Sequence, residues 1–502
     1  MGIKSLLAKP YAKYIAAKVR KQSLNALPTQ ENIFKHLIAK AALTEFGKTH
    51  HFNGIRTYED FTSNIPLTDY EKFQPWLQKI RNGEPDITWP GNPVYICKTS
   101  GTTSGIKHIP ITRESMPHHI TSVRNALLMY IAQTGNADFV NGKMVFLQGS
   151  PLLTEENGIK TGRLSGIAAH YVPAYLQGNR LPSFKTNCID DWETKVEAIV
   201  QETAKKDMRL IGGVPSWTLG YFDTLLKYTE KKTVKEIFPY FSLYVYGGLN
   251  FEPYRERFKK VIGCDIPTVQ LYPASEGFIA YQDDQHNEGM LLVTNGGIFF
   301  EFVDLENFDS RQPEKSKRIW LQNVELNKNY ALVINSNAGL WGYVIGDTIK
   351  FISKHPYRII VTGRIHHYTS AFGEHVMMEE VDYAMKFAID KTGAQVVEYT
   401  LAPMVNPATG LPYHEWLVEF AEIPEALDAF KIALDEGLCE KNVYYRDLLK
   451  GKVLRPLELT VLKKQSFHNY MKENGKLGGQ HKIPRLSNNR QIAEALYKWK
   501  NN

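Results

Sequence analysis

Helical and strand-like patterns alternate along the middle of this chain, and that alternation restricts its fold more than any other feature. Helical periodicity occurs at residues 116–134, 192–206, 215–228 and 253–261, and short apolar runs typical of strands occur at 143–147, 208–212, 242–246 and 267–272. Strands separated by helices form βαβ units with parallel pairing. Further strand-like runs between residues 290 and 361 indicate an antiparallel or barrel-like region. We therefore expect an α/β fold with parallel and mixed sheets.

The composition changes near Gly363, and we place a domain boundary there. Beyond it the patterns mix as in an α+β domain, with helices at 379–391 and 424–436 and strands at 395–401, 413–421 and 456–462. A chain of 502 residues is long enough for more than one hydrophobic core. We predict a large N-terminal domain at residues 1–363 and a small α+β domain at residues 364–502.

A loop rich in threonine, serine and glycine follows a short strand-like run at residues 94–97. Residues 98–107 read KTSGTTSGIK and end on Lys107. Glycines let the backbone approach a ligand closely, and hydroxyl and N–H groups can surround an anion whose charge a lysine neutralises. The spacing of a Walker A loop is absent. The loop therefore predicts phosphate binding, although an ordinary turn between a strand and a helix also fits it.

Two later segments place polar side chains at predicted strand ends. Residues 271–277, LYPASEG, contain Ser275 and Glu276, at the end of a strand where parallel sheets bind their ligands. Glu276 could ligate Mg²⁺ while Ser275 contacts a phosphoryl oxygen. Residues 342–347, GYVIGD, end on Asp347, which could accept hydrogen bonds from both ribose hydroxyls, with a turn at Gly346 placing it at a strand end. Taken singly, each segment also fits a helix N-terminus or a common turn.

Charge and cysteine content argue against several other classes of protein. The net charge of +7 on 502 residues gives no argument for nucleic-acid binding. The cysteines, Cys97, Cys188, Cys264 and Cys439, lie far apart and have neither disulfide-framework nor zinc-site spacing, which favours the cytoplasm. No apolar run approaches the roughly 20 residues that span a bilayer, so we expect no stable membrane insertion.

The N-terminal region is basic and helical, and no acidic residue precedes Glu31. The apolar residues that share one helical face are Leu7, Tyr11, Tyr14, Ile15 and Val19. A surface helix docked on the body fits this pattern, and a membrane-surface helix or a transit peptide is the alternative. Further helices are expected at residues 30–46 and 58–81, with breaks at Pro66 and Pro75.

Taken together and in this order, the three segments resemble the adenylate-forming (ANL) superfamily of acyl-CoA synthetases, luciferases and amino-acid adenylating domains. More narrowly, the chain is similar to the acyl-acid amido synthetases of the auxin-conjugating type, as a bacterial member. That family's first segment reads Ser-Ser-Gly-Thr-Ser/Thr, a small residue, Gly and then Lys, and residues 99–107 match it with Thr99 in place of serine. Its second segment contains Tyr and Ser-Ser-Glu, matched here by Tyr272 and residues 274–276, where Ala274 replaces the first serine.

The third family segment contains Tyr, Gly and Asp, matched by Tyr343, Gly346 and Asp347. Residues 479–485, GQHKIPR, are similar to the family's late Gln-aromatic-Lys-x-Pro-Arg segment. The wider superfamily often has an acid after its hinge Gly-Arg, and this chain lacks one after Arg364, so the exact hinge residue stays open.

The resemblance implies a role for each matching residue. The residues assigned to ATP are Thr99, Ser100, Thr102, Thr103 and Lys107 at the phosphates, Gly247 and Gly248 at the adenine, Tyr272 and Ser275 at the adenylate, Asp347 at the ribose, and Arg364 beside the hinge. Glu276 would hold Mg²⁺, and Lys482, on a mobile C-terminal lid domain, would reach the α-phosphate and the carboxylate during adenylation. An acyl pocket would be lined by residues 116–129, 213–217 and 244–249, with Trp217 and Tyr246 as candidate walls.

The implied activity is that of a ligase with two half-reactions. A carboxylic acid reacts with ATP to give an acyl-adenylate, and an amine, expected to be an amino acid, then takes the acyl group and releases AMP. An acyl-CoA ligase or another acyl-adenylate transferase of the same superfamily is the first alternative. A non-catalytic nucleotide-binding or membrane-surface protein, anchored by the basic N-terminal helix, is the second.

Overall fold

The computed structural model describes residues 2–99, 107–171, 177–247, 251–308, 312–365, 376–450, 453–477, 482–487 and 489–501. Within these ranges the chain forms two compact units. The first unit comprises Met1–Val214, Phe238–Gly248 and Ile266–Val361, and the second comprises Pro215–Ile237, Leu249–Asp265 and Thr362–Asn502. The predicted division into domains at residues 1–363 and 364–502 stays a prediction.

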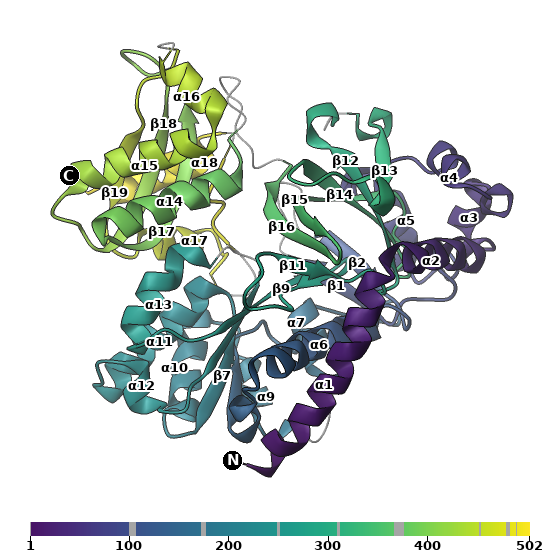
Figure 1. The fold of residues 1–502 in the computed structure, drawn as a ribbon, viewed down its shortest axis with the longest axis horizontal. Helices are drawn as coiled ribbons and strands as arrows, with labels where there is room; N and C mark the ends of the chain where they lie inside the picture. The colour runs from purple at the N-terminus through teal and green to yellow at the C-terminus, as the bar shows by residue number, and fades with distance from the viewer. Residues whose placement is uncertain are drawn as a thin grey trace. The chain divides into compact units, whose positions relative to one another are not determined.

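The first unit is built around one large mixed sheet (Figure 1). Its strands occur in the spatial order β13-β12-β14-β15-β16-β11-β10-β9-β8-β7-β3-β6. Their bounds are β3 Lys143–Phe146, β6 Arg180–Leu181, β7 Met208–Gly212, β8 Leu243–Gly247, β9 Thr268–Ala274, β10 Gly277–Tyr281, β11 Met290–Leu292, β12 Ile298–Asp304, β13 Arg318–Trp320, β14 Asn329–Ser336, β15 Tyr343–Lys354 and β16 Tyr357–Arg364.

Pairing in this sheet changes from parallel to antiparallel at β9. Strands β6, β3, β7, β8 and β9 pair in parallel, as the predicted βαβ units require. The hairpin of β9 and β10 begins the antiparallel part, which continues through β11 and β16. The strand-rich region predicted after residue 290 therefore lies in the same sheet as the parallel strands, as its antiparallel part.

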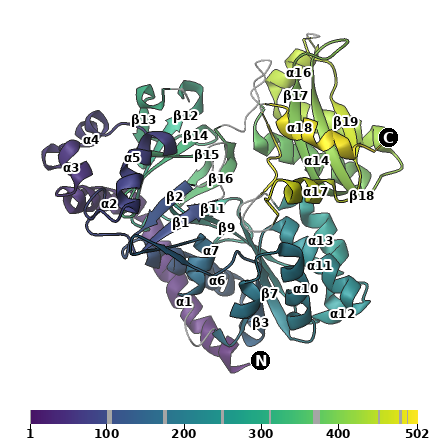
Figure 2. The same ribbon diagram turned by 180° about the vertical axis from the view of Figure 1, so that it is seen from behind.

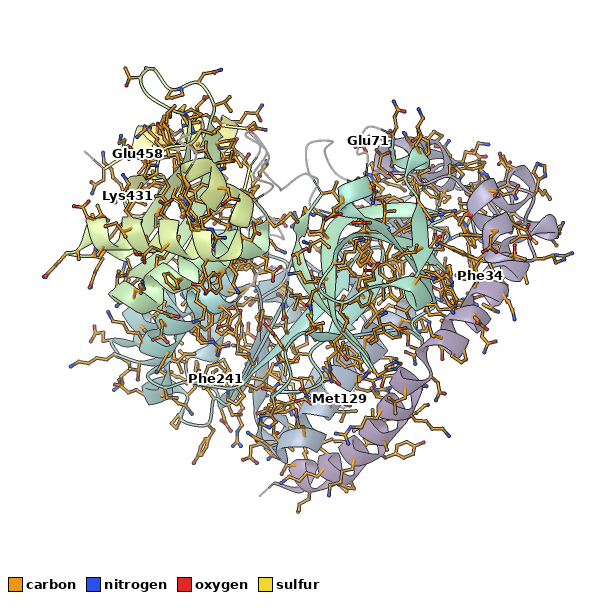
Figure 3. All side chains as sticks on the ribbon, turned by 45° about the horizontal axis from the view of Figure 1, so that its top comes forward. Phe34, Glu71, Met129, Phe241, Lys431 and Glu458 are labelled. Atoms are coloured by element: carbon orange, nitrogen blue, oxygen red, sulfur yellow. The ribbon has the colours of Figure 1, made fainter. Side chains whose placement is uncertain are left out.

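Alternating apolar side chains give this sheet two buried faces. Phe278 and Tyr281 of β10 pack into one core, whereas Ile279 and Ala280 between them pack into the other. The first core also receives α6, and Met129 of that helix lies within it (Figure 3). Neighbouring residues of a regular strand point to opposite faces, and the register shift between Phe278 and Ala280 places the neighbours Ile279 and Ala280 in the same core. A strand buried on both sides is apolar throughout.

Helices of the first unit cover both faces of its large sheet. Their bounds are α1 Ile3–Leu24, α2 Ala26–Ala41, α3 Glu45–Thr49, α4 Tyr58–Asn64, α5 Tyr70–Arg81, α6 Met116–Thr134, α7 Leu164–Ala169, α9 Phe184–Asn187 and α10 Trp192–Thr203. Helices α1 and α6 lie side by side and share a core (Figures 1 and 2). On the other side of the sheet, Phe34 of α2 meets Phe61 of α4 edge to face, with 5.2 Å between ring centroids (Figure 3).

The basic N-terminal segment forms the long helix α1, and its apolar residues divide between two faces. Ile15 and Val19 are buried against the body, whereas Leu7, Tyr11 and Tyr14 are exposed. The docked-helix interpretation therefore fits the structure, but the single apolar face expected from the sequence does not exist. No helix within the described residues is long and apolar enough to cross a membrane.

The helical breaks predicted at the two prolines differ in outcome. Pro66 lies between α4 and α5, as predicted, but Pro75 lies inside α5, so a break there was wrong. Proline removes one helical hydrogen bond. Helix α5 nevertheless continues, because Phe73 and Leu77 on either side of Pro75 are buried and hold it to the core.

A second, smaller sheet in the first unit carries the ends of the predicted phosphate loop. Its strand order is β2-β1-β5-β4, with bounds β1 Tyr95–Thr99, β2 Lys107–Ile111, β4 Thr154–Glu156 and β5 Ile159–Gly162. Strands β1 and β2 are antiparallel, whereas β1 and β5 are parallel. The predicted turn between a strand and a helix is thus a connection between two paired strands.

The second unit contains the three-stranded sheet β17-β18-β19. Its elements are α11 Pro215–Thr229, α12 Val234–Ile237, α13 Arg255–Ile262, α14 Met378–Thr392, β17 Gln395–Met404, β18 Tyr413–Glu422, α15 Leu427–Lys441, α16 Val443–Lys450, β19 Glu458–Leu462, α17 Ser466–Glu473 and α18 Gln491–Leu496. Figure 1 faces α14 and α15, which cover one side of this sheet, and Figure 2 faces α17 and α18, which cover the other. Lys431 of α15 pairs with Glu458 of β19 at 2.7 Å (Figure 3).

Candidate functional site

The two ends of the predicted phosphate loop lie opposite each other in the small sheet. Thr99, the last residue of β1, pairs with Lys107, the first residue of β2. The Lys107 ammonium lies 5.3 Å from the centre of the Tyr70 ring, and the backbone N–H of His108 donates to the Tyr70 hydroxyl at 3.1 Å. Tyr70 thus fixes the start of β2 and attracts the lysine charge through its ring face. The predicted residues Ser100, Thr102 and Thr103 lie outside the described residues.

Ser275 and Glu276 form the two-residue turn between β9 and β10. The pair Ala274 and Gly277, which flanks this turn, ends the two strands. This turn lies at the carboxyl end of β9, the last parallel strand, as predicted. Both side chains are half-buried. The turn therefore presents a hydroxyl and a carboxylate at the edge of the sheet where α/β proteins bind ligands.

Cys97 joins the phosphate-loop strand to this turn. Its thiol donates to Ser275 Oγ at 3.1 Å. Burial raises the pKa of Cys97 to about 12, so the thiol keeps its proton and acts as a donor. Sequence reasoning treated Cys97 only as a cysteine without a partner, although its place directly before the loop was visible.

Asp347 and Tyr272 connect the second and third segments. The Tyr272 hydroxyl donates to Asp347 Oδ2 at 2.6 Å, and Tyr272 itself is 8% exposed. A carboxylate held by a phenol in this way keeps a fixed orientation. The contact of Asp347 with a ribose stays a prediction. Asp347 is half-buried, so it remains accessible from one side.

The strand that carries Asp347 departs from the prediction. Asp347 lies inside β15 rather than at a strand end, so the turn expected at Gly346 was wrong. Ala331 pairs with Thr348 and Val333 with Val344, which leaves a bulge at Gly346. Gly346 has a φ of +94°, a conformation that glycine adopts without strain. Such a bulge re-aims the next side chain while the strand continues on both sides.

Tyr343, at the start of β15, is near enough to Glu276 of the second segment for the two groups to interact electrostatically. It is fully buried, and its hydroxyl makes no hydrogen bond within the described part of the chain. Burial raises the pKa of Tyr343 well above its ordinary value, and the negative charge of Glu276 raises it further. The phenol therefore stays protonated and offers a donor close to Glu276. We refer to Thr99, Lys107, Tyr272, Ser275, Glu276, Tyr343 and Asp347 as the three-segment site.

Gly247, predicted beside the adenine, ends β8 and pairs with Leu271 of β9. A Cβ atom added to Gly247 would lie 2.8 Å from the carbonyl oxygen of Leu271, closer than such atoms approach. Strand packing therefore accounts for the glycine, and its contact with adenine stays a prediction. Gly248 lies outside the described residues. The candidate acyl walls divide between the compact units, Tyr246 in the first and Trp217 in the second.

Lys482 and Arg364 belong to the second unit and are not part of the three-segment site. Arg364 is half-buried at the end of β16, next to Gly363, whose φ is +151°. Lys482 is exposed, and the residues after it are bound along β17. The backbone N–H of Leu401 donates to the Arg485 carbonyl at 2.9 Å, and Ser487 N–H donates to the Leu401 carbonyl at 3.0 Å.

Arg485 anchors the lysine segment in the second unit. It is 1% exposed, donates to Asp382 at 3.0 Å and lies 3.4 Å from Glu398. Its guanidinium also lies 4.7 Å from the ring centres of Tyr254 and Tyr399. A guanidinium enclosed by carboxylates and aromatic faces has a fixed position, so the backbone three residues from Lys482 is fixed too.

The donor set fits Mg²⁺ only in the presence of a nucleotide. Among the described residues, no group of three or more His, Cys, Asp and Glu side chains could hold a metal ion. Mg²⁺ keeps several waters and binds through one or two carboxylates together with substrate phosphates. Glu276, a half-buried carboxylate beside Ser275, is a ligand of this kind.

Comparison with known proteins identifies the family. The model of the GH3 family N-terminal domain matches residues 15–187, that of the central domain matches residues 291–364, and that of the C-terminal domain matches residues 379–491. The chain belongs to the GH3 family. The matches follow one another in the order N-terminal, central and C-terminal, so the family likeness extends over most of the chain.

Named relatives of this GH3 chain align along nearly its whole length. The jasmonoyl–L-amino acid synthetase JAR4 of Nicotiana attenuata is 22% identical over 91% of this chain and 90% of the relative. The indole-3-acetic acid-amido synthetase GH3.3 of Arabidopsis thaliana is 22% identical over 93% of this chain and 90% of the relative. Both are plant proteins, so a bacterial origin stays a prediction.

Solved structures share the fold. An AtGH3.15 acyl acid amido synthetase in complex with 2,4-DB has a TM-score of 0.79 at 16% identity, covering 97% of this chain and 96% of that chain. A 2-hydroxyisobutyryl-CoA ligase in complex with 2-HIB-AMP has a TM-score of 0.58 at 12% identity, covering 96% of this chain and 92% of that chain. The predicted class, a large N-terminal α/β part with a smaller α+β C-terminal part, is confirmed.

Proposed function

We propose that this GH3 chain is an ATP-dependent acyl-acid amido synthetase that joins a carboxylic acid to an amine, with an amino acid as the acceptor. The observation that carries the proposal is the convergence of three distant segments in the first unit. Cys97 links the phosphate-loop strand to Ser275, and Tyr272 links the same turn region to Asp347. GH3 relatives named as amido synthetases support the choice of reaction.

In the first half-reaction, a carboxylate oxygen of the acid attacks the α-phosphorus of ATP. The bond from that phosphorus to the leaving oxygen breaks, which gives the acyl-adenylate and pyrophosphate. Thr99 and Lys107, with Ser100, Thr102 and Thr103 of the loop, would bind the phosphates, and Asp347 would bind the ribose. Mg²⁺ held by Glu276 would neutralise phosphate charge, and positioned cations act in the same way on charge that develops in phosphoryl transfer.

In the second half-reaction, the amine nitrogen attacks the acyl carbon of the adenylate. The carbon–oxygen bond to AMP breaks, the amide forms and the amine loses a proton. We propose that the domain at residues 364–502 turns about Gly363 and Arg364 between the two steps. Lys482 would then act at the α-phosphate during adenylation, as a compact charge carried by a moving domain. The proposed location is the cytoplasm.

The decisive experiment is pyrophosphate exchange over a panel of carboxylic acids. The panel includes indole-3-acetic acid, jasmonic acid, 2,4-DB, benzoates and aliphatic acids. We expect exchange that depends on one or a few acids, followed by AMP release that depends on an amino acid. AMP release with coenzyme A but with no amine would instead assign the chain to the acyl-CoA ligases. No exchange with any acid would contradict adenylation itself.

Substitution of Lys482 tests the catalytic assignment. We expect Lys482→Ala to lower the pyrophosphate-exchange rate roughly 100- to 1,000-fold, since it removes a charge that stabilises the transition state. The dissociation constant of ATP, measured by equilibrium binding, should change little. Lys476→Ala is a matched control, because Lys476 is an exposed lysine of the same unit. Unchanged exchange in Lys482→Ala would refute the assignment.

A further inference from the structure

Arg163 lies at the same edge of the large sheet as the three-segment site. It directly follows β5, whose last residue, Gly162, pairs with Cys97 of β1. Cys97 in turn donates to Ser275 Oγ at 3.1 Å. A chain of short contacts thus runs from the residue before Arg163 to the turn that carries Glu276.

The stem of Arg163 lies near the carboxyl end of β3, the strand next to the edge strand β6. A Cβ atom added to Gly149 would lie 3.0 Å from Arg163 Cδ. Gly149 follows β3, and β3, β7, β8 and β9 are consecutive parallel strands. Their carboxyl ends share one edge, where open α/β sheets bind ligands. Arg163 therefore projects over this edge between the ends of β1 and β3.

The guanidinium of Arg163 has no direct partner among the described residues. It is half-buried, yet across the ranges that the structure describes it makes neither a hydrogen bond nor an ion pair. The negative charge that acts on it is that of Asp190, which is exposed, whereas the nearby Cys97 thiol is protonated and carries no charge. An arginine has five N–H donors, and removing them partly from water without partners is costly unless a ligand supplies acceptors.

The neighbouring cation, Lys195, is already committed to the protein. It is 3% exposed and donates to the carbonyl oxygens of Asn187 at 2.6 Å and Gln148 at 3.1 Å. Burial lowers the pKa of Lys195, and the positive charge of Arg163 lowers it further, so the two cations lie close enough to repel each other. Within the described part of the chain, the one carboxylate that acts on both Arg163 and Lys195 is Asp190, so this part of the site carries excess positive charge for an anion to neutralise.

We propose that Arg163 binds the carboxylate of the acid substrate and holds one of its oxygens toward the α-phosphate of ATP. This inference rests on the proposed amido synthetase activity. The phosphates have Lys107 and the loop beside it, whereas the acid has no other assigned cation in the first unit. The planar fork of a guanidinium matches a carboxylate with two parallel hydrogen bonds, which orients the acid as well as attracting it.

The test separates the contribution of Arg163 to acid binding from any contribution to ATP binding. In pyrophosphate exchange with the best acid of the panel, Arg163→Gln should raise KM for the acid roughly 10- to 100-fold, as expected when a charged hydrogen-bonding partner is lost. KM for ATP should change less than about twofold. Arg163→Lys keeps the charge but loses the planar fork, so its KM for the acid should lie between those of the wild type and Arg163→Gln. The matched control is Arg180→Gln, because Arg180 is also half-buried but already donates to the Ala169 carbonyl at 3.0 Å.

Each contrary result has a distinct meaning. A rise in KM for ATP without a rise in KM for the acid would overturn the proposal and indicate that Arg163 binds the phosphates. Unchanged constants in both Arg163 variants would make Arg163 a structural residue. If the wild type exchanges pyrophosphate with no acid, the proposed function fails, and calorimetric titration with 2,4-DB alone then decides on Arg163. Equal binding by the wild type and Arg163→Gln, or none by either, would overturn the inference, and loss of binding in the variant would support it.

Discussion

At the scale of single residues, the hydrogen bond between Tyr272 and Asp347 gives the most direct test of nucleotide binding. The two groups are 2.6 Å apart. Tyr272→Phe removes the donor that orients the carboxylate, and a hydrogen bond to a charged group is worth about 1.5–3 kcal/mol. We expect KM for ATP to rise about tenfold in pyrophosphate exchange, and more in Asp347→Asn. In the control Tyr130→Phe, which alters a phenol bonded to Asn136 at 3.4 Å, KM for ATP should stay the same.

Lys195 predicts a dependence of stability on pH. Burial lowers the pKa of Lys195 from 10.5 to about 8. Below pH 8 both the folded and the unfolded protein hold the proton, and the folded protein pays the full cost of the buried charge. Between pH 8 and 10.5 only the unfolded chain holds it, so the free energy of unfolding rises with pH, by about 3 kcal/mol in total.

Denaturant unfolding of the wild type and of Lys195→Met at pH 7, 8, 9 and 10 measures this effect. The difference in unfolding free energy, wild type minus variant, should increase steadily above pH 8, because the variant lacks the titrating group. The comparison cancels other groups that titrate in this range. A constant difference across the series would show that Lys195 keeps an ordinary pKa in the folded protein.

At the scale of secondary-structure elements, the bulge in β15 predicts that alanine at Gly346 weakens ATP binding beyond what the loss of stability alone would cause. Gly346 has a φ of +94° with open space where a Cβ atom would be placed, and Gly410, in an exposed loop, has a φ of +79° with equally open space. Alanine at either position should therefore cost a similar free energy of unfolding, about 1 kcal/mol.

Only Gly346→Ala should also raise KM for ATP, several-fold, because relaxation of the bulge turns Asp347 away from Tyr272. Thermal unfolding and pyrophosphate-exchange kinetics of both variants give the comparison. The role of the bulge is contradicted if the two variants have the same kinetic constants.

The sequence predicted elements well where periodicity alone determines them. Helix α6 and strand β7 have the predicted bounds, because a buried stripe or a short apolar run is visible locally. Strand β2 and the bulge at Gly346 were missed, since both depend on pairing with another strand. The contact of Cys97 with Ser275 joins residues 178 positions apart, and no local pattern indicates such a contact.

At the scale of the whole molecule, the second compact unit includes residues that precede the predicted domain boundary, such as Leu249–Asp265. This difference decides which residues would move together. Tyr254 precedes the predicted boundary at residues 363 and 364, whereas Glu398 and Arg485 follow it. The Tyr254 hydroxyl nevertheless donates to Glu398 at 2.8 Å within the second unit, and its ring faces Arg485. If residues 364–502 turn as one body between half-reactions, this contact must break and form again in each cycle.

Tyr254→Phe should therefore change the balance of the two half-reactions. The substitution removes one buried hydrogen bond that holds a single orientation, worth about 1–2 kcal/mol, so the ratio of the adenylation rate to the transfer rate should shift about five- to thirtyfold. Pyrophosphate exchange measures the first step, and single-turnover transfer from the acyl-adenylate to an amino acid measures the second. The control is Tyr445→Phe, which removes a phenol bonded to Asp435 at 2.5 Å, because both residues follow the boundary. If both variants lose stability but keep the wild-type ratio, Tyr254 travels with residues 364–502, and the moving body is the whole second unit.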